Sequence, residues 1–302
     1  MKGAQDTVIQ IDGLTKHYGK VNKVRALDGL SLDVYRGEIF GYLGPNGAGK
    51  TTTIRLLLDL IRPTAGRAAI FGMDVNRDSV RLHARLGNLP GELALWNHMT
   101  GWEVVEYLGG LSGGVDMTYV RDLVDRLDVD MTRKVRACST GMKRKLGLIQ
   151  ALMHKPDLLI LDEPTNGLDP LAQQVFHQLM REVAAEGRTV FLSSHNLTEV
   201  EAICDRVGIL RQGQLKAVER ISALKQVHFR WMKLYMDGPV DPAAFAALDG
   251  VSDVTQENGA IRFRVTGKLS PVIKLAARYE VNDLEYEEPN LEEIFLEYYG
   301  ER

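Results

Sequence analysis

The spacing of apolar side chains changes several times along the first part of the chain. Short alternating runs over 8–11 and 30–34 predict strands that are separated by turns. A short apolar run over 38–43 ends at Gly44, and residues 51–61 then carry apolar side chains at helical spacing until Pro63 stops the helix. The pattern therefore predicts a strand, a glycine-containing loop and a helix in direct succession.

Helical spacing dominates between residues 100 and 149. Thr100 and Glu103 have the separation of a capping box, in which two side chains satisfy backbone N–H groups at the start of a helix. Residues 120–127 place their apolar side chains on one helical stripe. We therefore expect amphipathic helices in this region.

A continuous apolar run over 158–161 is typical of a strand that is buried on both faces in a parallel sheet. The patterns after it predict a helix over 171–185, a strand over 189–192 and a helix over 197–204. Strands and helices that alternate in this way favour an α/β domain with a mainly parallel sheet.

The order of elements changes near residue 223, where the patterns predict the β-α-β-β-α-β succession of a ferredoxin-like unit. The predicted elements lie at 227–236, 242–248, 251–255, 261–265, 271–277 and 282–287. A closing helix follows, with Asn290 as N-cap. Its apolar face is either internal core or a homodimer contact and consists of Leu291, Ile294, Phe295 and Tyr298. We therefore divide the chain into a domain over 1–222 and a small α+β accessory domain over 223–302.

Composition excludes several classes of protein. A chain of 302 residues suits about two domains, and its 45% hydrophobic and 25% charged residues are ordinary globular values. The net charge of −3 gives no bulk attraction to nucleic acid or anionic lipid. Two cysteines are too few for a disulfide framework, and no apolar run reaches the ~18–20 residues that would span a bilayer. Residues 1–6 lack the apolar core of a secretory signal.

The glycine-containing loop fits the phosphate-binding pattern G-x-x-x-x-G-K-[ST] at every fixed position. Glycines let the backbone curl so that successive N–H groups point at phosphate oxygens, and the following helix adds its positive dipole end. Lys50 would reach the β- and γ-phosphates, and the Thr51 hydroxyl would bind Mg²⁺. The alternative is an ordinary glycine turn entering a helix. The loop residues are Gly44, Pro45, Asn46, Gly47, Ala48, Gly49, Lys50 and Thr51.

Two carboxylates follow the buried strand over 158–161. Ligands of open α/β sheets bind at the carboxyl ends of the strands, and Asp162 lies at that end. Asp162 suits a hard cation, directly or through water, and Glu163 is placed to polarise a water for attack on the γ-phosphorus. A strand-ending acidic turn is the structural alternative.

With these motifs the chain closely resembles the ATP-binding subunits of ABC transporters, over about residues 7–220. The phosphate loop, residues 161–170 (Leu-Asp-Glu-Pro-Thr-Asn-Gly-Leu-Asp-Pro) and Ser193-Ser194-His195 carry the resemblance. It implies a P-loop NTPase of ABC type with a mainly parallel sheet and a helical subdomain over about 92–150. It also implies ATP and Mg²⁺ as cofactors, and Thr52 is counted with the loop as a nucleotide-binding residue.

Residues 139–144 (Ser-Thr-Gly-Met-Lys-Arg) resemble the signature loop of the family in its exporter-type variant. By resemblance, Ser139 and Gly141 contact the γ-phosphate bound in the partner subunit, and a hydroxyl and a glycine at a helix N-terminus make a reasonable anion site. Residues 111–114 spell the commoner version, but Val115 follows instead of glutamine. We interpret that segment as a helix end and the turn to the next helix.

The resemblance also implies roles for three single residues. His195 would contact the γ-phosphate and orient Glu163 and the water, although a lone histidine there is otherwise a helix N-terminal or core residue. Tyr18 would stack on adenine, with a structural role as the alternative. Asp169 would lie at the dimer seam.

The chain departs from the family at one position. Gly91 stands where the family usually has glutamine, or glutamate in some exporter types, which senses Mg²⁺ and the attacking water. Either Glu92 takes over after a small loop shift, or water fills the gap and Glu92 is a solvated loop acid.

The signature and phosphate loops cannot meet within one such domain, so the resemblance implies two chains arranged head to tail, most simply as a homodimer. The second partner would be a transmembrane permease subunit, docked on the region around 92–150 with residues 96–102 near it. The chain would thus power an exporter from the cytoplasmic face of the membrane, as a peripheral subunit, with no nucleic acid as partner.

Two other functions compete with this hypothesis. A soluble ABC-type ATPase that acts on nucleic acid or ribosomes usually carries two such domains, coiled-coil insertions or basic linkers, and none is visible in the sequence. A regulatory ATP-sensing module without turnover would lack the Glu163 carboxylate, which is present.

Overall fold

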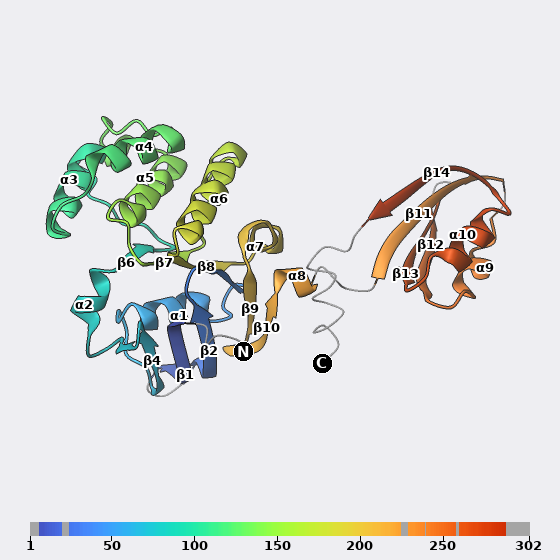
Figure 1. Cartoon of the computed structure of the whole chain (residues 1–302), viewed down its shortest axis with the longest axis horizontal. Coiled ribbons are helices and arrows are strands. Elements are labelled where there is room, and N and C mark those ends of the chain that lie inside the picture. Colours follow the sequence, from blue (N-terminus) through green and yellow to red (C-terminus); the bar gives the residue numbers. More distant parts are fainter. Residues whose placement is uncertain (1–5, 20–23, 225–228, 239, 258–259, 288–302) are drawn as a thin grey trace. The chain divides into compact units, whose positions relative to one another are not determined.

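The chain folds as two compact units, residues 1–221 and residues 222–302. The computed structural model describes five stretches of them, namely 6–19, 24–224, 229–238, 240–257 and 260–287. Figure 1 shows the elements of each unit.

The first unit contains two sheets. The strands are β1 (Thr7–Tyr18), β2 (Val24–Tyr35), β3 (Ile39–Leu43), β4 (Ala65–Ile70), β5 (Met73–Asp74), β6 (Leu86–Leu89), β7 (Leu158–Asp162), β8 (Thr189–Ser194), β9 (Arg206–Arg211) and β10 (Gln214–Arg220). One sheet is antiparallel, in the order β2-β1-β4-β5. The other has the order β10-β9-β3-β8-β7-β6, and only its β9–β10 pair is antiparallel. The carboxyl ends of β3, β6, β7 and β8 therefore meet at one edge.

The helices of this unit differ in where they lie relative to its sheets. The helices are α1 (Lys50–Leu57), α2 (Ser79–His83), α3 (Gly101–Leu111), α4 (Met117–Leu127), the 3₁₀ helix η1 (Val135–Ala137), α5 (Thr140–Leu152), α6 (Pro170–Ala185) and α7 (Leu197–Ile203). The short helix α8 (Ile221–Leu224) spans the boundary between the two units. Helices α3 to α6 gather on one side of the β6–β7–β8 edge, whereas α1 lies between the two sheets (Figure 1).

The main core lies where the two sheets and α1 meet. Ile9 of β1, Leu27 of β2 and Ile54 of α1 are buried in one cluster with Phe40 and Phe191 of the parallel strands. Complete burial of such side chains stabilises the fold by about 1.5–3 kcal/mol each. This packing fixes α1, and with it the loop that precedes α1, against the end of β3.

The confirmed predictions concern the strongly patterned segments. The capping box at Thr100 is formed on both sides, and the apolar stripe of residues 120–127 is buried on α4. The run over 158–161 is the fully buried parallel strand β7. The fold class expected from these patterns is therefore confirmed, with an antiparallel sheet in addition to the parallel one.

Other predicted boundaries were wrong. The strand predicted over 8–11 continues to Tyr18, because Gly13 adopts a left-handed φ of 57° and forms an irregularity within the strand instead of a turn that ends it. The helix predicted to Ile61 ends at Leu57, since Asp59 is left-handed with a φ of 56°. The sequence patterns missed β4, β5, β6, β9 and β10.

The second unit has the predicted order of elements. They are β11 (Phe229–Asp237), α9 (Pro242–Ala246), β12 (Val251–Glu257), β13 (Ala260–Thr266), α10 (Ser270–Ala276) and β14 (Glu280–Glu287). All pairs are antiparallel, in the order β12-β13-β11-β14, which places the first and third strands in the centre as in a ferredoxin-like sheet. Phe245 of α9 and Phe263 of β13, with ring centroids 5.3 Å apart, anchor a separate core.

Two further expectations concern the chain as a whole. The closing helix with Asn290 as N-cap, together with its apolar face, lies outside the described residues. Within the stretches that the structure describes, no helix combines the length and the apolar character needed to cross a membrane.

Candidate active site at the edge of the parallel sheet

The phosphate loop connects β3 to α1, and its glycines are required by its shape. Gly47 and Gly49 have φ values of 80° and 113°, which side-chain-bearing residues rarely adopt. A Cβ atom on Gly44 would lie 2.4 Å from the carbonyl oxygen of Leu210. Gly49 is the N-cap of α1 and provides no side-chain cap, so the first turn of α1 faces the loop with its backbone N–H groups. This is the arrangement that binds an anion at a helix N-terminus.

The remaining loop residues differ in exposure. Pro45 and Asn46 are exposed, whereas Ala48 is buried and its N–H donates to the Pro45 carbonyl over 3.1 Å. Thr52 is half-buried in the first turn of α1. The loop therefore presents backbone to solvent on one side and packs against the core on the other.

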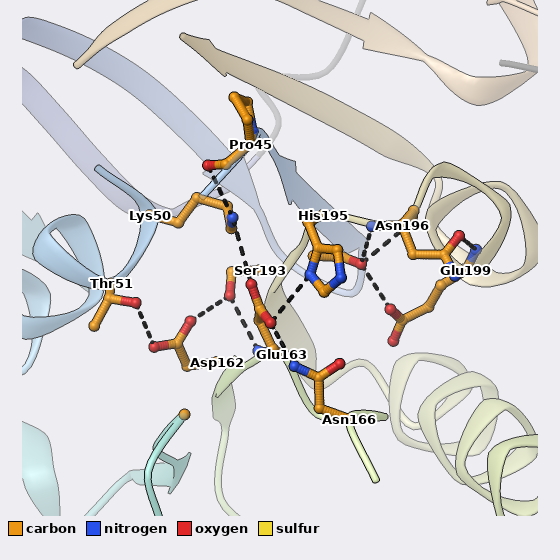
Figure 2. A network of polar contacts seen from close by, with 12 residues as sticks. Pro45, Lys50, Thr51, Asp162, Glu163, Asn166, Ser193, His195, Asn196 and Glu199 are labelled. Atoms are coloured by element: carbon orange, nitrogen blue, oxygen red, sulfur yellow. Dashed lines mark hydrogen bonds and ion pairs between the residues drawn. The ribbon is translucent and has the colours of Figure 1, made fainter. Parts of the chain in front are cut away.

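Lys50 is buried and its ammonium group lies at the centre of the loop. Its Nζ donates to the carbonyl oxygens of Gly44 and Pro45 over 2.6 and 3.3 Å, and it lies 3.4 Å from Oε1 of Glu163 (Figure 2). The ammonium group thus joins the phosphate loop to the end of β7.

Thr51, Asp162 and Ser193 form a chain of hydrogen bonds across three elements (Figure 2). The Thr51 hydroxyl donates to Oδ2 of Asp162 over 2.8 Å, and the Ser193 hydroxyl donates to Oδ1 over 2.5 Å. Asp162 is only 3% exposed. A buried carboxylate beside a hydroxyl offers the oxygen ligands that a hard cation such as Mg²⁺ prefers.

A cation at this point would not be held by protein alone. Among the described residues, no cluster of three or more His, Cys, Asp or Glu side chains could hold a metal ion. The Thr51 and Asp162 oxygens therefore fit a cation that takes its other ligands from water and phosphate oxygens, which is the usual way in which Mg²⁺ binds.

Glu163 follows β7 in a left-handed conformation, with a φ of 48°. Its backbone N–H donates to the hydroxyl and carbonyl oxygens of Ser193, and its Oε2 accepts from Nδ2 of Asn166 over 2.5 Å. His195 places Nδ1 at 3.1 Å from the same oxygen. Donors therefore surround a carboxylate that remains 19% exposed toward solvent.

The electrostatic environment keeps Glu163 ionised. Burial acts to raise the pKa of Glu163, but hydrogen bonds from His195 and Asn166 and the charge of Lys50 outweigh it, so the pKa lies below its ordinary value. At neutral pH this side chain is a carboxylate, which accepts hydrogen bonds from water.

Hydrogen bonds of the neighbouring Ser194 fix the backbone segment that bears His195. The Ser194 hydroxyl donates to Oε2 of the buried Glu199 over 2.7 Å and accepts from the N–H of Asn196 over 2.9 Å. Burial raises the pKa of Glu199 above its ordinary value. The imidazole of His195 is itself 47% exposed, so it faces the open side of the site while its backbone is held.

Sequence reasoning assigned no role to Ser193 and Asn166. A signal for Ser193 exists in the sheet, because Asp162 of β7 and Ser193 of β8 are directly paired parallel neighbours. Asn166 lies in the turn three residues after Glu163, and only the three-dimensional path of that turn brings its amide to the carboxylate.

Three predicted residues lie outside this network. Tyr18 is at the end of β1 and 38% exposed, with Nζ of Lys16 at 5.3 Å from its ring centroid. Ser139 is the N-cap of α5 and accepts from the N–H of Met142 over 3.2 Å. Gly141 approaches the carbonyl of Gly167, where a Cβ atom would lie at 2.9 Å. Within the part of the chain that the structure describes, no polar contact joins Ser139 or Gly141 to the phosphate loop of the same chain.

A pocket of about 390 Å³ opens beside the Thr51–Asp162 pair. Gly91 and Glu92 line it together with Glu163. A Cβ atom on Gly91 would lie 3.1 Å from Oδ2 of Asp162, so the backbone of residue 91 packs against the carboxylate, whereas Glu92 is exposed.

Residues 111–114 are the exposed end of α3 and the turn to α4, as predicted for that segment.

Comparison with known proteins decides the family. A family model described as "ABC transporter" matches residues 27–166. The bacitracin transport ATP-binding protein BcrA of Enterococcus faecalis is 33% identical over 97% of this chain and 96% of its own length. The chain belongs to the ABC transporter ATP-binding proteins. The family expected from the motifs is thereby confirmed, and it is a family of ATP-binding chains.

Two more proteins extend the similarity. The daunorubicin resistance ATP-binding protein DrrA3 of Streptomyces coeruleorubidus is 35% identical to this ABC ATP-binding protein over 98% of the chain and 97% of its own length. A bacterial ABC transporter cassette, MJ0796, described in dimeric form, has a TM-score of 0.66 and 22% identity, and covers 70% of this chain and 98% of that one. The latter likeness supports the ABC cassette fold of the first unit.

Proposed function

We propose that this chain is the ATP-hydrolysing subunit of an ABC exporter, in which ATP binding closes a dimer of two copies and hydrolysis reopens it. The observation that carries the proposal is the Glu163 carboxylate. It is held by His195 and Asn166 and lies 3.4 Å from Lys50, next to the Thr51–Asp162 pair. A phosphate-binding loop with an ionised carboxylate at its open side is suited to hydrolysis as well as to binding.

ATP would bind along the phosphate loop. Backbone N–H groups of residues 44–51 and the first turn of α1 would face the phosphates, and Lys50 would exchange the Gly44 and Pro45 carbonyls for β- and γ-phosphate oxygens. The exposed ring of Tyr18 at the end of β1 would stack on adenine. Thr51 and Asp162 would hold Mg²⁺, which when bound neutralises charge on the β- and γ-phosphates.

Hydrolysis would depend on positioning and electrostatics. Because the pKa of Glu163 lies below its ordinary value, the carboxylate is a weak base that orients and polarises the attacking water. His195 would fix the carboxylate through Nδ1 and contact the γ-phosphate from its exposed side. Phosphoryl transfer needs mainly this kind of alignment, since little covalent chemistry is left to the protein.

The complete site would need two chains. Ser139 and Gly141 begin α5 and make no polar contact with their own phosphate loop among the described residues. In a two-fold dimer they would meet the γ-phosphate bound to the partner, so each nucleotide is held between two copies. The dimeric description of MJ0796 supports this arrangement. Loss of phosphate would remove the contacts across the interface and let the dimer open.

The second partner would be a transmembrane permease. Trp96, in the segment before α3, and Tyr107 of α3 form an edge-to-face aromatic pair with ring centroids 5.2 Å apart. The two side chains are 40% and 48% exposed. Such a partly exposed aromatic pair suits a protein interface. The names of BcrA, a bacitracin transport protein, and DrrA3, a daunorubicin resistance protein, support a transporter that acts on antibiotic-like compounds. This chain would then work at the cytoplasmic face of the membrane, without nucleic acid as partner. The unit over 222–302 would be an accessory domain of the same subunit.

Isolation from membranes tests the proposal. The tagged full chain is expressed in its native host and purified from detergent-solubilised membranes. We expect a membrane protein with several spans to co-purify, and the complex to hydrolyse MgATP faster than the chain alone. A Lys50→Ala chain should still associate with that partner but lose hydrolysis. Recovery of the chain with ribosomes or nucleic acid, and not with a membrane protein, would refute the exporter function.

A further inference from the structure

Arg144 lies in the second turn of α5 and has an unusual set of partners. Its side chain is 5% exposed, and its guanidinium donates to five backbone carbonyls. The acceptors are the carbonyls of Pro90 at 2.7 Å, Gly91 at 3.2 Å, Asp162 at 2.5 Å and Pro164 at 3.2 Å, and that of Glu163. One side chain therefore ties together two segments that both border the proposed active site.

The first segment is the turn that carries the carboxylates. Glu163 has a left-handed φ of 48°, a strained conformation for a residue other than glycine that persists only where its surroundings fix it. Arg144 binds the carbonyls on both sides of that conformation, and Ser193 binds the N–H. Charge-assisted hydrogen bonds of a guanidinium are about twice as strong as neutral ones.

The second segment is the loop after β6. Arg144 holds the carbonyl of Gly91, whose Cα packs against Asp162 so closely that a Cβ atom would lie 3.1 Å from Oδ2. A shift of the guanidinium would thus be felt at the proposed metal ligand as well as at Glu163. Interiors that are packed in this way transmit small displacements.

Arg144 and Ser139 belong to the same helix. Ser139 caps the N-terminus of α5, and Arg144 follows five residues later on the same rigid element (144 − 139 = 5). Under the proposed function, Ser139 meets the nucleotide bound to the partner, whereas Glu163 serves the nucleotide bound to its own chain. Helix α5 therefore connects the two nucleotide sites of the dimer.

We propose that Arg144 is a positioning residue that sets the backbone of Asp162 and Glu163 according to the position of α5, and so couples the two ATP sites. The inference rests on the proposed function, because it needs a dimer with composite sites. ATP bound to the partner chain contacts the N-terminus of α5 and sets the position of this helix. The Arg144 guanidinium moves with α5 and so sets the position of the Glu163 carboxylate in the site of its own chain. Hydrolysis is then cooperative in ATP, and the cooperativity passes through this side chain.

Kinetics of two substitutions test the coupling. In the full chain, Arg144→Gln removes the charge and most of the donors, whereas Arg144→Lys keeps the charge but loses the planar array of donors. We expect Arg144→Gln to lower kcat by roughly 10- to 10²-fold, as misplacement of a reacting group does. Nucleotide affinity, measured with a fluorescent ATP analogue, should stay within about twofold, because the phosphate loop is untouched. The Hill coefficient for ATP should fall from about 2 toward 1, and Arg144→Lys should recover part of both kcat and cooperativity.

Arg126→Gln is the matched control. Arg126 forms a bidentate pair with Glu182 between α4 and α6, over 2.7 and 2.9 Å, so its loss weakens packing without touching the site. It should lower the Tm and leave kcat and the Hill coefficient unchanged. The coupling is refuted if Arg144→Gln keeps the wild-type Hill coefficient. It is also refuted if Arg144→Gln and a control variant with the same loss of Tm show the same decrease in kcat. Absence of MgATP turnover in the wild-type chain would instead contradict the proposed function itself.

Discussion

Replacing Glu163 by glutamine tests the proposed hydrolysis most directly. The two side chains have the same size, but one carboxylate oxygen forms an ion pair with Lys50 over 3.4 Å and the other contacts His195 and Asn166. An amide has only one oxygen, so its NH₂ group must face a donor whichever way it turns. The water then loses both its acceptor and its alignment.

The size of the effect follows from that loss. Removing a positioned base lowers turnover by roughly 10²- to 10⁴-fold, which corresponds to about 3–5 kcal/mol in the activation free energy. ATP affinity should persist or rise, since a negative charge near the γ-phosphate disappears. We therefore expect Glu163→Gln to accumulate as an ATP-bound dimer.

Two measurements check this prediction in the full-length chain. A coupled assay gives the MgATPase rate, and light scattering after size-exclusion chromatography gives the mass with ATP and with ADP. Glu106→Gln, on the exposed face of α3, is the control and should behave as wild type. A Glu163→Gln chain that hydrolyses ATP at the wild-type rate would show that the carboxylate has another role.

Three further predictions concern other parts of the chain. Lys50→Ala should abolish ATP affinity, because the loop loses its buried cation; nucleotide binding at wild-type strength in a filter assay would refute the phosphate-loop assignment. Ser139→Arg should remove ATPase activity while Ser112→Arg, in the exposed turn after α3, should leave it intact, and the reverse result would mean that the other loop is the signature. Phe245→Ala should destabilise the second unit by about 3–5 kcal/mol, since the ring is fully buried, yet leave ATP binding unchanged; calorimetry would show one shifted transition, and a loss of nucleotide affinity would contradict independent units.

Two short sequence patterns predicted the part of the fold that carries the candidate site. The loop before Lys50 and the buried strand before Asp162 can be recognised in the sequence. Glycine spacing and a continuous apolar run are properties of a short segment and do not depend on residues far away in the chain. They place two strand ends and one helix N-terminus at the same sheet edge. The proximity of Thr51 to Asp162, 2.8 Å between oxygen atoms, is a consequence of that placement.

Features that depend on distant partners were not predictable in the same way. Strand β4 carries three alanines and a glycine and shows no alternating pattern, so only its pairing with β1 makes it a strand. Arg144 ends the segment that resembles the signature loop, and the sequence does not indicate its five carbonyl acceptors, which come from segments up to 54 residues away. The left-handed conformation of Glu163 is likewise fixed by neighbours in space.

The back of the phosphate loop rests on two strands from different sheets. A Cβ atom on Gly49 would lie 2.6 Å from the carbonyl of Ala26 in β2, and one on Gly44 would collide with Leu210 of β9. The phosphate loop is therefore preorganised, and binding of a nucleotide loses little conformational entropy of the backbone. Association rates should then be set by diffusion and by electrostatic steering, and any preference for a triphosphate over a diphosphate should lie in residence time.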